Sequence, residues 1–152
     1  MIAAIPANAV RVAQFDDRNW IVVEPYVYVT TLISPGTRIV VPAGFVTDGA
    51  SVPRVFWRIV PPFGLHFNAA VVHDWLYRNR PHQLTKGAAD AVFSEIMARD
   101  GVPEPIRIAL REAVDLWGAS SFYYSKELPL AAADAPEAPD LPPQSQPEAP
   151  AV

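Results

Sequence analysis

The spacing of apolar residues changes once along this chain, and that change constrains the fold more than any other feature. From Ala9 to Thr47 the residues favour strands, with alternating apolar positions and many Val, Tyr and Thr side chains. From Asn68 onward the apolar residues recur at helical spacing. We therefore expect an α+β fold, in which a small N-terminal antiparallel β-meander accompanies a three-helix core.

Turn and cap residues set the expected boundaries. Strands are expected at Val10–Val12, within Trp20–Leu32, at Arg38–Val41 and at Phe45–Thr47, with turns at Ser34–Thr37 and Pro42–Gly44. Helices are expected at Asn68–Arg78, Thr85–Arg99 and Pro105–Trp117. Asn68 and Thr85 are suitable N-caps, and Gly101 is suited to end the second helix.

The composition separates a folded body from a tail. Residues 1–128 are expected to form one domain, which is β-rich at 1–47, a loop at 48–67 and helical at 68–128. Residues 129–152 hold seven of the 17 prolines and no aromatic residue, so we expect a disordered, acidic Pro/Ala-rich tail. Four of the 16 acidic residues lie in this tail, which leaves 12 acidic and 12 basic residues in the body. A neutral body without basic clusters makes nucleic acid an unexpected partner.

The absence of cysteine excludes disulfides, thiolate metal sites and a thiol nucleophile. Met1–Val10 lacks the basic and apolar regions of a signal peptide, and no apolar run approaches the roughly 18 residues of a membrane span. We therefore expect a cytoplasmic protein with no signal peptide and no transmembrane segment.

The first expected helix carries a His-Asp pair in an otherwise apolar run. His73 and Tyr77 are four residues apart and share one face of that helix, whereas Asp74 is turned away by about 100°. Asp90 lies on the apolar stripe of the second helix, which should pack antiparallel to the first and bring Asp90 opposite His73. A carboxylate that holds one imidazole nitrogen leaves the other to act as a general base near neutral pH.

A second group of oxygen ligands is expected beside this base. Asp74 should face the turn-rich loop at Phe45–Arg54, where Asp48 supplies another carboxylate. Carboxylate and carbonyl oxygens without thiolates or paired histidines suit Ca²⁺. A cation beside a His-activated water can support ester hydrolysis, because the metal stabilises the oxyanion while the histidine supplies the base.

Two other interpretations stay open. In the first, His73 is a core histidine with satisfied hydrogen bonds, Asp74 pairs with Arg78, and Asp48 closes an Asx-turn. In the second, Ser51 is the nucleophile of a Ser-His-Asp hydrolase that uses the same histidine and the aspartate of the second helix, although no nucleophile elbow is present. The other two histidines lie in loops and are expected to be solvated.

The span Val41–Trp117 resembles a small domain family of unknown function found in tailed phages, prophages and bacteria. Its most specific parts are Pro42–Arg54 and His73–Tyr77. The resemblance implies a phage or prophage origin, and a location in the cytoplasm of the bacterial host or in the virion. The proline-rich tail would then be a segment able to dock on virion proteins.

About half of the chain is also similar to the bacterial and fungal branch of secreted phospholipase A2. The similarity is carried by Thr47-Asp48, Pro62–Gly64 with Phe67–Ala69, His73-Asp74 with Tyr77–Asn79, Asp90 with Phe93 and Met97, and Ala113-Val114 with Trp117-Gly118. It implies His73 as the base, Asp90 with Tyr77 as the pair that orients it, and three calcium ligands: Asp48, Asp74 and the Gly49 carbonyl. Unlike that family, this chain has no cysteine and is expected to have no signal peptide, and its N-terminal strands have no counterpart there.

These features favour a calcium-dependent, phospholipase A2-like hydrolase of phage or prophage origin that acts on a phospholipid or another acyl ester. The competing class is a non-catalytic phage virion or host-interaction protein on the same scaffold, because a shared fold does not establish a shared activity.

Overall fold

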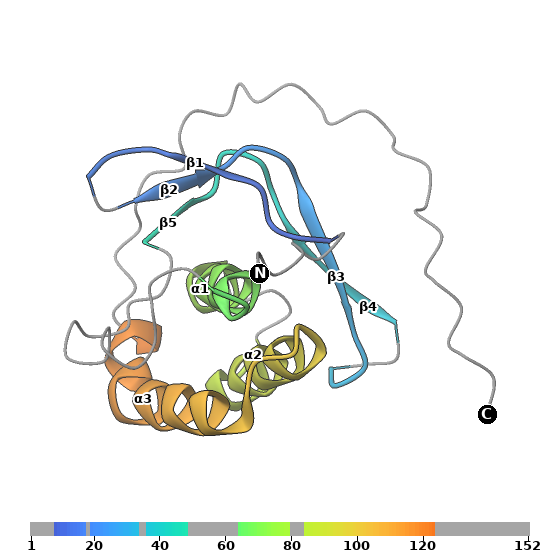
Figure 1. The fold of residues 1–152 in the computed structure, drawn as a ribbon, viewed down its shortest axis with the longest axis vertical. Coiled ribbons are helices and arrows are strands. Elements are labelled where there is room, and N and C mark those ends of the chain that lie inside the picture. The colour runs from blue at the N-terminus through green and yellow to red at the C-terminus, as the bar shows by residue number, and fades with distance from the viewer. Residues whose placement is uncertain (1–7, 18, 34–35, 49–63, 80–83, 124–152) are drawn as a thin grey trace.

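The computed structural model describes residues 8–17, 19–33, 36–48, 64–79 and 84–123, without the side chains of residues 117 and 119–123. Its elements are β1 (Val12–Gln14), β2 (Trp20–Val22), β3 (Tyr26–Thr30), β4 (Thr37–Val41), β5 (Val46–Thr47), α1 (Phe67–Asn79), α2 (Lys86–Arg99) and α3 (Glu104–Tyr123). Helix α1 lies between the strands on one side and α2 and α3 on the other (Figure 1). The α+β class expected from the sequence is confirmed, whereas the expected loop at 48–67 and the tail at 129–152 lie largely outside the described residues.

The strands form two small antiparallel sheets instead of one meander. One sheet has the order β1-β2-β5, and the other pairs β3 with β4. The single run expected at Trp20–Leu32 divides into β2 and β3 around Pro25, which has no N–H to donate to a ladder. Gly44 turns the chain toward β5 with a φ of +85°, and its N–H donates to the carbonyl of Val22 at 2.7 Å.

The helix caps confirm part of the expected boundaries. Thr85 caps α2, because its side chain accepts a hydrogen bond from the N–H of Ala88 at 3.2 Å. Gly101 follows α2 with a φ of +76°, which is the left-handed conformation common after a helix. Helix α3 extends beyond its expected end at Trp117 to Tyr123.

The prediction for Asn68 is wrong, because α1 begins one residue earlier and Asn68 is not an N-cap. The side chain is buried, and its Oδ1 accepts from the N–H of Val10 at 2.9 Å. Its Nδ2 donates to Asp100 at the end of α2, also at 2.9 Å. The amide therefore joins the start of α1 to two distant segments, and these hydrogen bonds satisfy its buried polar atoms. His66, expected to be solvated, is also buried.

The core lies where α1 contacts both α2 and the strands. Its largest completely enclosed apolar side chains are Val22, Val41, Val71, Val72, Leu76, Val92, Ile96 and Met97. Truncating a large one among them to alanine costs about 2–5 kcal/mol. None of the helices in the described part of the chain is long and apolar enough to cross a membrane.

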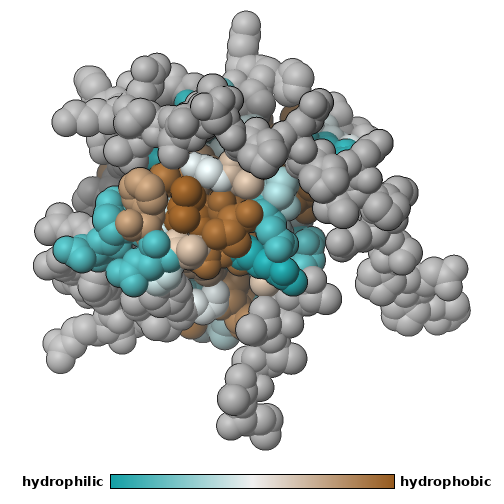
Figure 2. Space-filling view, turned by 90° about the horizontal axis from the view of Figure 1, so that it is seen from above, coloured by the Kyte–Doolittle hydropathy of each residue, from teal (hydrophilic) through white to brown (hydrophobic). Residues whose placement is uncertain are grey.

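The outer face of the three-stranded sheet also carries apolar residues. Ala13, Ile21 and Val46 form one row across β1, β2 and β5, opposite to the buried face that holds Val22 and Thr47. Viewed from above, the described surface shows an apolar area with hydrophilic residues on both sides (Figure 2). The sheet therefore has apolar residues on both faces, as strands with residues of high β-propensity often do.

Candidate functional site

The first two helices pack antiparallel, and this packing assembles the site. The start of α1 meets the end of α2 at Asn68 and Asp100, while the middle of α1 meets the first half of α2 at His73 and Asp90. Asp90 thus lies opposite His73 and Tyr77, which share one face of α1 four residues apart.

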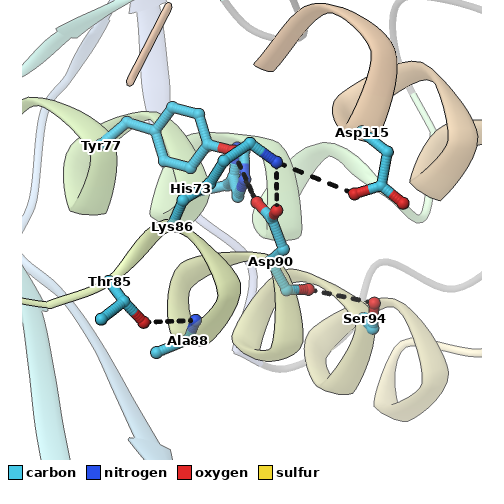
Figure 3. A network of polar contacts seen from close by, with 8 residues as sticks. All are labelled: His73, Tyr77, Thr85, Lys86, Ala88, Asp90, Ser94 and Asp115. Atoms are coloured by element: carbon cyan, nitrogen blue, oxygen red, sulfur yellow. Dashed lines mark hydrogen bonds and ion pairs between the residues drawn. The ribbon is translucent and has the colours of Figure 1, made fainter. Parts of the chain in front are cut away.

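Three side chains converge on the carboxylate of Asp90 (Figure 3). His73 Nε2 lies 2.8 Å from Oδ1, and the Tyr77 hydroxyl donates to the same oxygen at 2.6 Å. Lys86 Nζ donates to Oδ2 at 2.6 Å and lies 3.7 Å from Asp115 of α3. The Asp90 and Lys86 side chains are each only 20% exposed, so these charge-assisted bonds are shielded from bulk water.

The protonation states of this cluster follow from burial and from its hydrogen bonds. Burial alone would raise the pKa of Asp90, but the bonds from His73, Lys86 and Tyr77 outweigh it and hold that pKa below its usual value. Burial lowers the pKa of His73 and outweighs the opposite effect of Asp90. Burial and Asp90 raise the pKa of the Tyr77 phenol, which therefore remains a donor.

These states define the tautomer of His73. An ionised Asp90 can only accept, so the neutral imidazole must carry its proton on Nε2, and the lone pair lies on Nδ1. The ring packs against two aromatic side chains, with centroid distances of 4.0 Å to Tyr77 and 4.9 Å to Phe93. The site therefore holds a neutral, oriented imidazole, which is the form required of a general base.

The other side of α1 carries a second carboxylate, Asp74. Its Oδ2 lies 2.9 Å from Nη2 of Arg78 but receives no well-aligned hydrogen bond. Arg78 also donates to the Val46 carbonyl at 2.7 Å. Burial raises the pKa of Asp74 to about 7, and the charge of Asp48 acts in the same direction, against the effects of Arg78 and Thr47.

The structure brings the predicted site residues into two groups. His73, Tyr77 and Asp90 meet between α1 and α2, and Asp74 lies near the end of β5, where Asp48 follows. Gly49 and Ser51, predicted as a calcium ligand and as an alternative nucleophile, lie outside the described residues. Among the residues that the structure describes, no three His, Asp or Glu side chains are grouped as metal ligands.

Lys86 is the site residue that sequence reasoning overlooked. Its position four residues before Asp90 on the same helix was the available sign of an ion pair. No sequence pattern indicated Asp115 as a site residue, because its distance from Lys86 depends on how α3 packs.

Comparison with known proteins identifies a family but no activity. A family model described as "Protein of unknown function (DUF1353)" matches residues 20–114, which is more than half of the chain and includes His73, Tyr77, Lys86 and Asp90. This match confirms the expected uncharacterised domain family. No curated protein and no solved structure matches the chain. The chain belongs to the DUF1353 family of proteins of unknown function.

Proposed function

We propose that this protein is a calcium-dependent, phospholipase A2-like hydrolase that acts on the ester of a phospholipid or another acyl substrate. One observation carries the proposal: a single carboxylate oxygen of Asp90 is shared by His73 Nε2 and the Tyr77 hydroxyl. This arrangement orients the imidazole and leaves the basic lone pair on Nδ1, which would act on the reacting water.

In the proposed reaction, Nδ1 of His73 takes a proton from a water molecule while the water oxygen attacks the acyl carbon. Asp90 stabilises the imidazolium that forms, and Tyr77 holds Asp90 in place. The ester C–O bond then breaks, and the proton on His73 passes to the leaving oxygen. The products are a carboxylic acid and an alcohol, and His73 returns to its neutral form.

Asp74 and Asp48 are the proposed calcium ligands in the described part of the chain, with the Gly49 carbonyl as the proposed third. The donor set fits Ca²⁺, because carboxylate oxygens are its preferred ligands. Asp74 Oδ2 is buried without a well-aligned hydrogen bond, and the nearby Asp48 raises the Asp74 pKa, so a cation would relieve both conditions. A bound Ca²⁺ would polarise the ester carbonyl and stabilise the oxyanion.

The proposal includes a phage or prophage origin, with a location in the host cytoplasm or the virion. A second candidate is a non-catalytic virion or host-interaction protein, whose proline-rich tail would contact virion partners. One observation favours it: Arg78 joins Asp74 to the Val46 carbonyl, which is a structural use of the carboxylate that requires no metal.

The test is fatty-acid release from mixed phospholipid vesicles by the purified protein, first with Ca²⁺ and then with excess chelator. Release that depends on Ca²⁺ would support the hydrolase. Release that persists with chelator would support hydrolysis through His73 and contradict the proposed role of Ca²⁺. If neither condition yields fatty acid, the binding protein becomes the better interpretation.

A further inference from the structure

The mechanism proposed above uses His73, Tyr77 and Asp90 but leaves Lys86 without a part. We propose that Lys86 is a positioning residue of this site, which holds the second oxygen of Asp90 so that the first oxygen stays between His73 and Tyr77. This inference rests on the proposed function, and it assigns to Lys86 no contact with substrate.

The hydrogen bonds of Asp90 carry the first step of the argument. A carboxylate can rotate about its Cβ–Cγ bond and exchange its two oxygens. Here Oδ1 accepts from His73 and Tyr77, and Lys86 binds Oδ2 at 2.6 Å, so rotation would lengthen all three contacts together. Without Lys86, Asp90 would be held only at Oδ1, by His73 and Tyr77, and the carboxylate that orients the imidazole would be freer to rotate.

The position of Lys86 on its helix is the second step. It lies in the first turn of α2, where the helix dipole favours acidic residues, and α2 has no acidic residue there. Lysine placed before its acidic partner is also the weaker order for a pair four residues apart. Helix stability alone therefore does not favour a lysine at this position.

The packing of α3 is the third step. A Cβ added at Gly118 would lie 2.9 Å from the Tyr77 hydroxyl and 3.4 Å from Cε of Lys86. The α3 backbone therefore comes close to both side chains, and Asp115, one turn earlier, lies 3.7 Å from Lys86 Nζ. Lys86 is thus enclosed from the α3 side while its ammonium group faces Asp90 (Figure 3).

The experiment compares Lys86→Met with Lys86→Arg, which restores the positive charge and the donors. Arg111→Met is the matched control, because it removes one positive charge from an exposed position on α3. Ester hydrolysis gives kcat and KM, and nitrogen-resolved NMR reports the Nε2–H proton of His73. Circular dichroism checks folding, and Lys86→Gln replaces Lys86→Met in the comparison if the latter does not fold.

We expect Lys86→Met to lower kcat roughly 10-fold to 100-fold with little change in KM, since misplaced catalytic groups lose rates of this order. We also expect the Nε2–H resonance to broaden through faster exchange, and Lys86→Arg to recover both properties. Unchanged kcat and an unchanged resonance in Lys86→Met would overturn the proposal. If the wild-type protein hydrolyses no ester, the proposed function fails, and the NMR comparison alone decides whether Lys86 positions His73.

Discussion

Two carboxylates in this molecule have similar settings and opposite acidities. Asp90 and Asp74 both have side chains that are 20% exposed, and each has a basic residue four positions away on its own helix. Nevertheless, the pKa of Asp90 lies below its usual value, whereas that of Asp74 is raised to about 7. An ion pair at helical spacing therefore does not by itself determine the charge of a buried acid.

The difference comes from deeper burial of Asp74 and from the remaining partners of each carboxylate. Asp90 is held by donors from His73, Tyr77 and Lys86, which together outweigh the cost of its burial. For Asp74, burial is the largest effect, and the second acid Asp48 adds to it, so together they outweigh the arginine pair and the hydrogen bond with Thr47. One carboxylate is thus electrostatically satisfied, while the other would gain from an additional positive charge.

The strongest test of this contrast removes His73, the proposed base that binds Asp90. We expect His73→Gln to reduce ester hydrolysis by about 100-fold to 10,000-fold, the usual contribution of a general base. Ca²⁺ affinity, measured by calorimetry, should stay near that of the wild type, because His73 is not among the proposed ligands. In Asp74→Asn, hydrolysis and Ca²⁺ affinity should fall together. Normal hydrolysis by His73→Gln would reject the mechanism.

A pair of matched substitutions tests stability on the two sides. At pH 8 without Ca²⁺, we expect Asp90→Asn to lower the free energy of unfolding by about 1–3 kcal/mol, because the charged group that accepts three hydrogen bonds is lost. Asp74→Asn should leave the free energy of unfolding unchanged or higher, because burial disfavours the ionised form of Asp74.

Urea denaturation measures both values, and Asp17→Asn at an exposed position is the control for loss of one acid. Equal losses in Asp90→Asn and Asp74→Asn would mean that the two carboxylates do not differ as described.

Asp74 and Asp90 should contribute to the pH dependence of stability with opposite signs. Asp74 has its pKa raised from 3.8 to about 7, so the folded state binds the extra proton between these values, and its contribution to stability falls as the pH rises through this window. Asp90 has a lowered pKa, so its contribution is present above 3.8 and is lost as the pH falls through the folded value.

Denaturation of the wild type and both variants from pH 3 to 8, with chelator present, separates these contributions. The stability of the wild type relative to Asp74→Asn should increase from pH 7 to pH 4. Its advantage over Asp90→Asn should shrink below pH 4. An advantage over Asp74→Asn that grows with pH would contradict the raised pKa.

The part of the site that depends on local spacing could be predicted from the sequence. The four-residue separation of His73 and Tyr77, together with a short connection to the second helix, was enough to place Asp90 opposite them. The cap at Thr85 was predictable for the same reason, because its hydrogen bond closes within three residues.

Contacts between distant segments could not be predicted in this way. Asn68 has the sequence pattern of an N-cap, and only the tertiary fold reveals its partners Val10 and Asp100. The pairing of β2 with β5, which divides the strands into two sheets, likewise joins segments far apart in the chain. Asp74 could be a metal ligand or the ion-pair partner of Arg78, and both interpretations fit its position four residues before Arg78. The sequence therefore could not separate them.

The smallest effect is expected from Tyr77→Phe, which removes one of the donors that keep Asp90 satisfied. His73 and Lys86 would still bind the carboxylate, so the free energy of unfolding should fall by about 0.5–1.5 kcal/mol, the net value of one hydrogen bond. The aromatic ring remains beside His73, so the fold and KM should be preserved while kcat falls. Urea denaturation and steady-state kinetics measure these changes. A loss above this range that equals the loss in Asp90→Asn would show that Tyr77, and not the number of donors, determines the state of Asp90, and the contrast with Asp74 would then depend on one hydroxyl group.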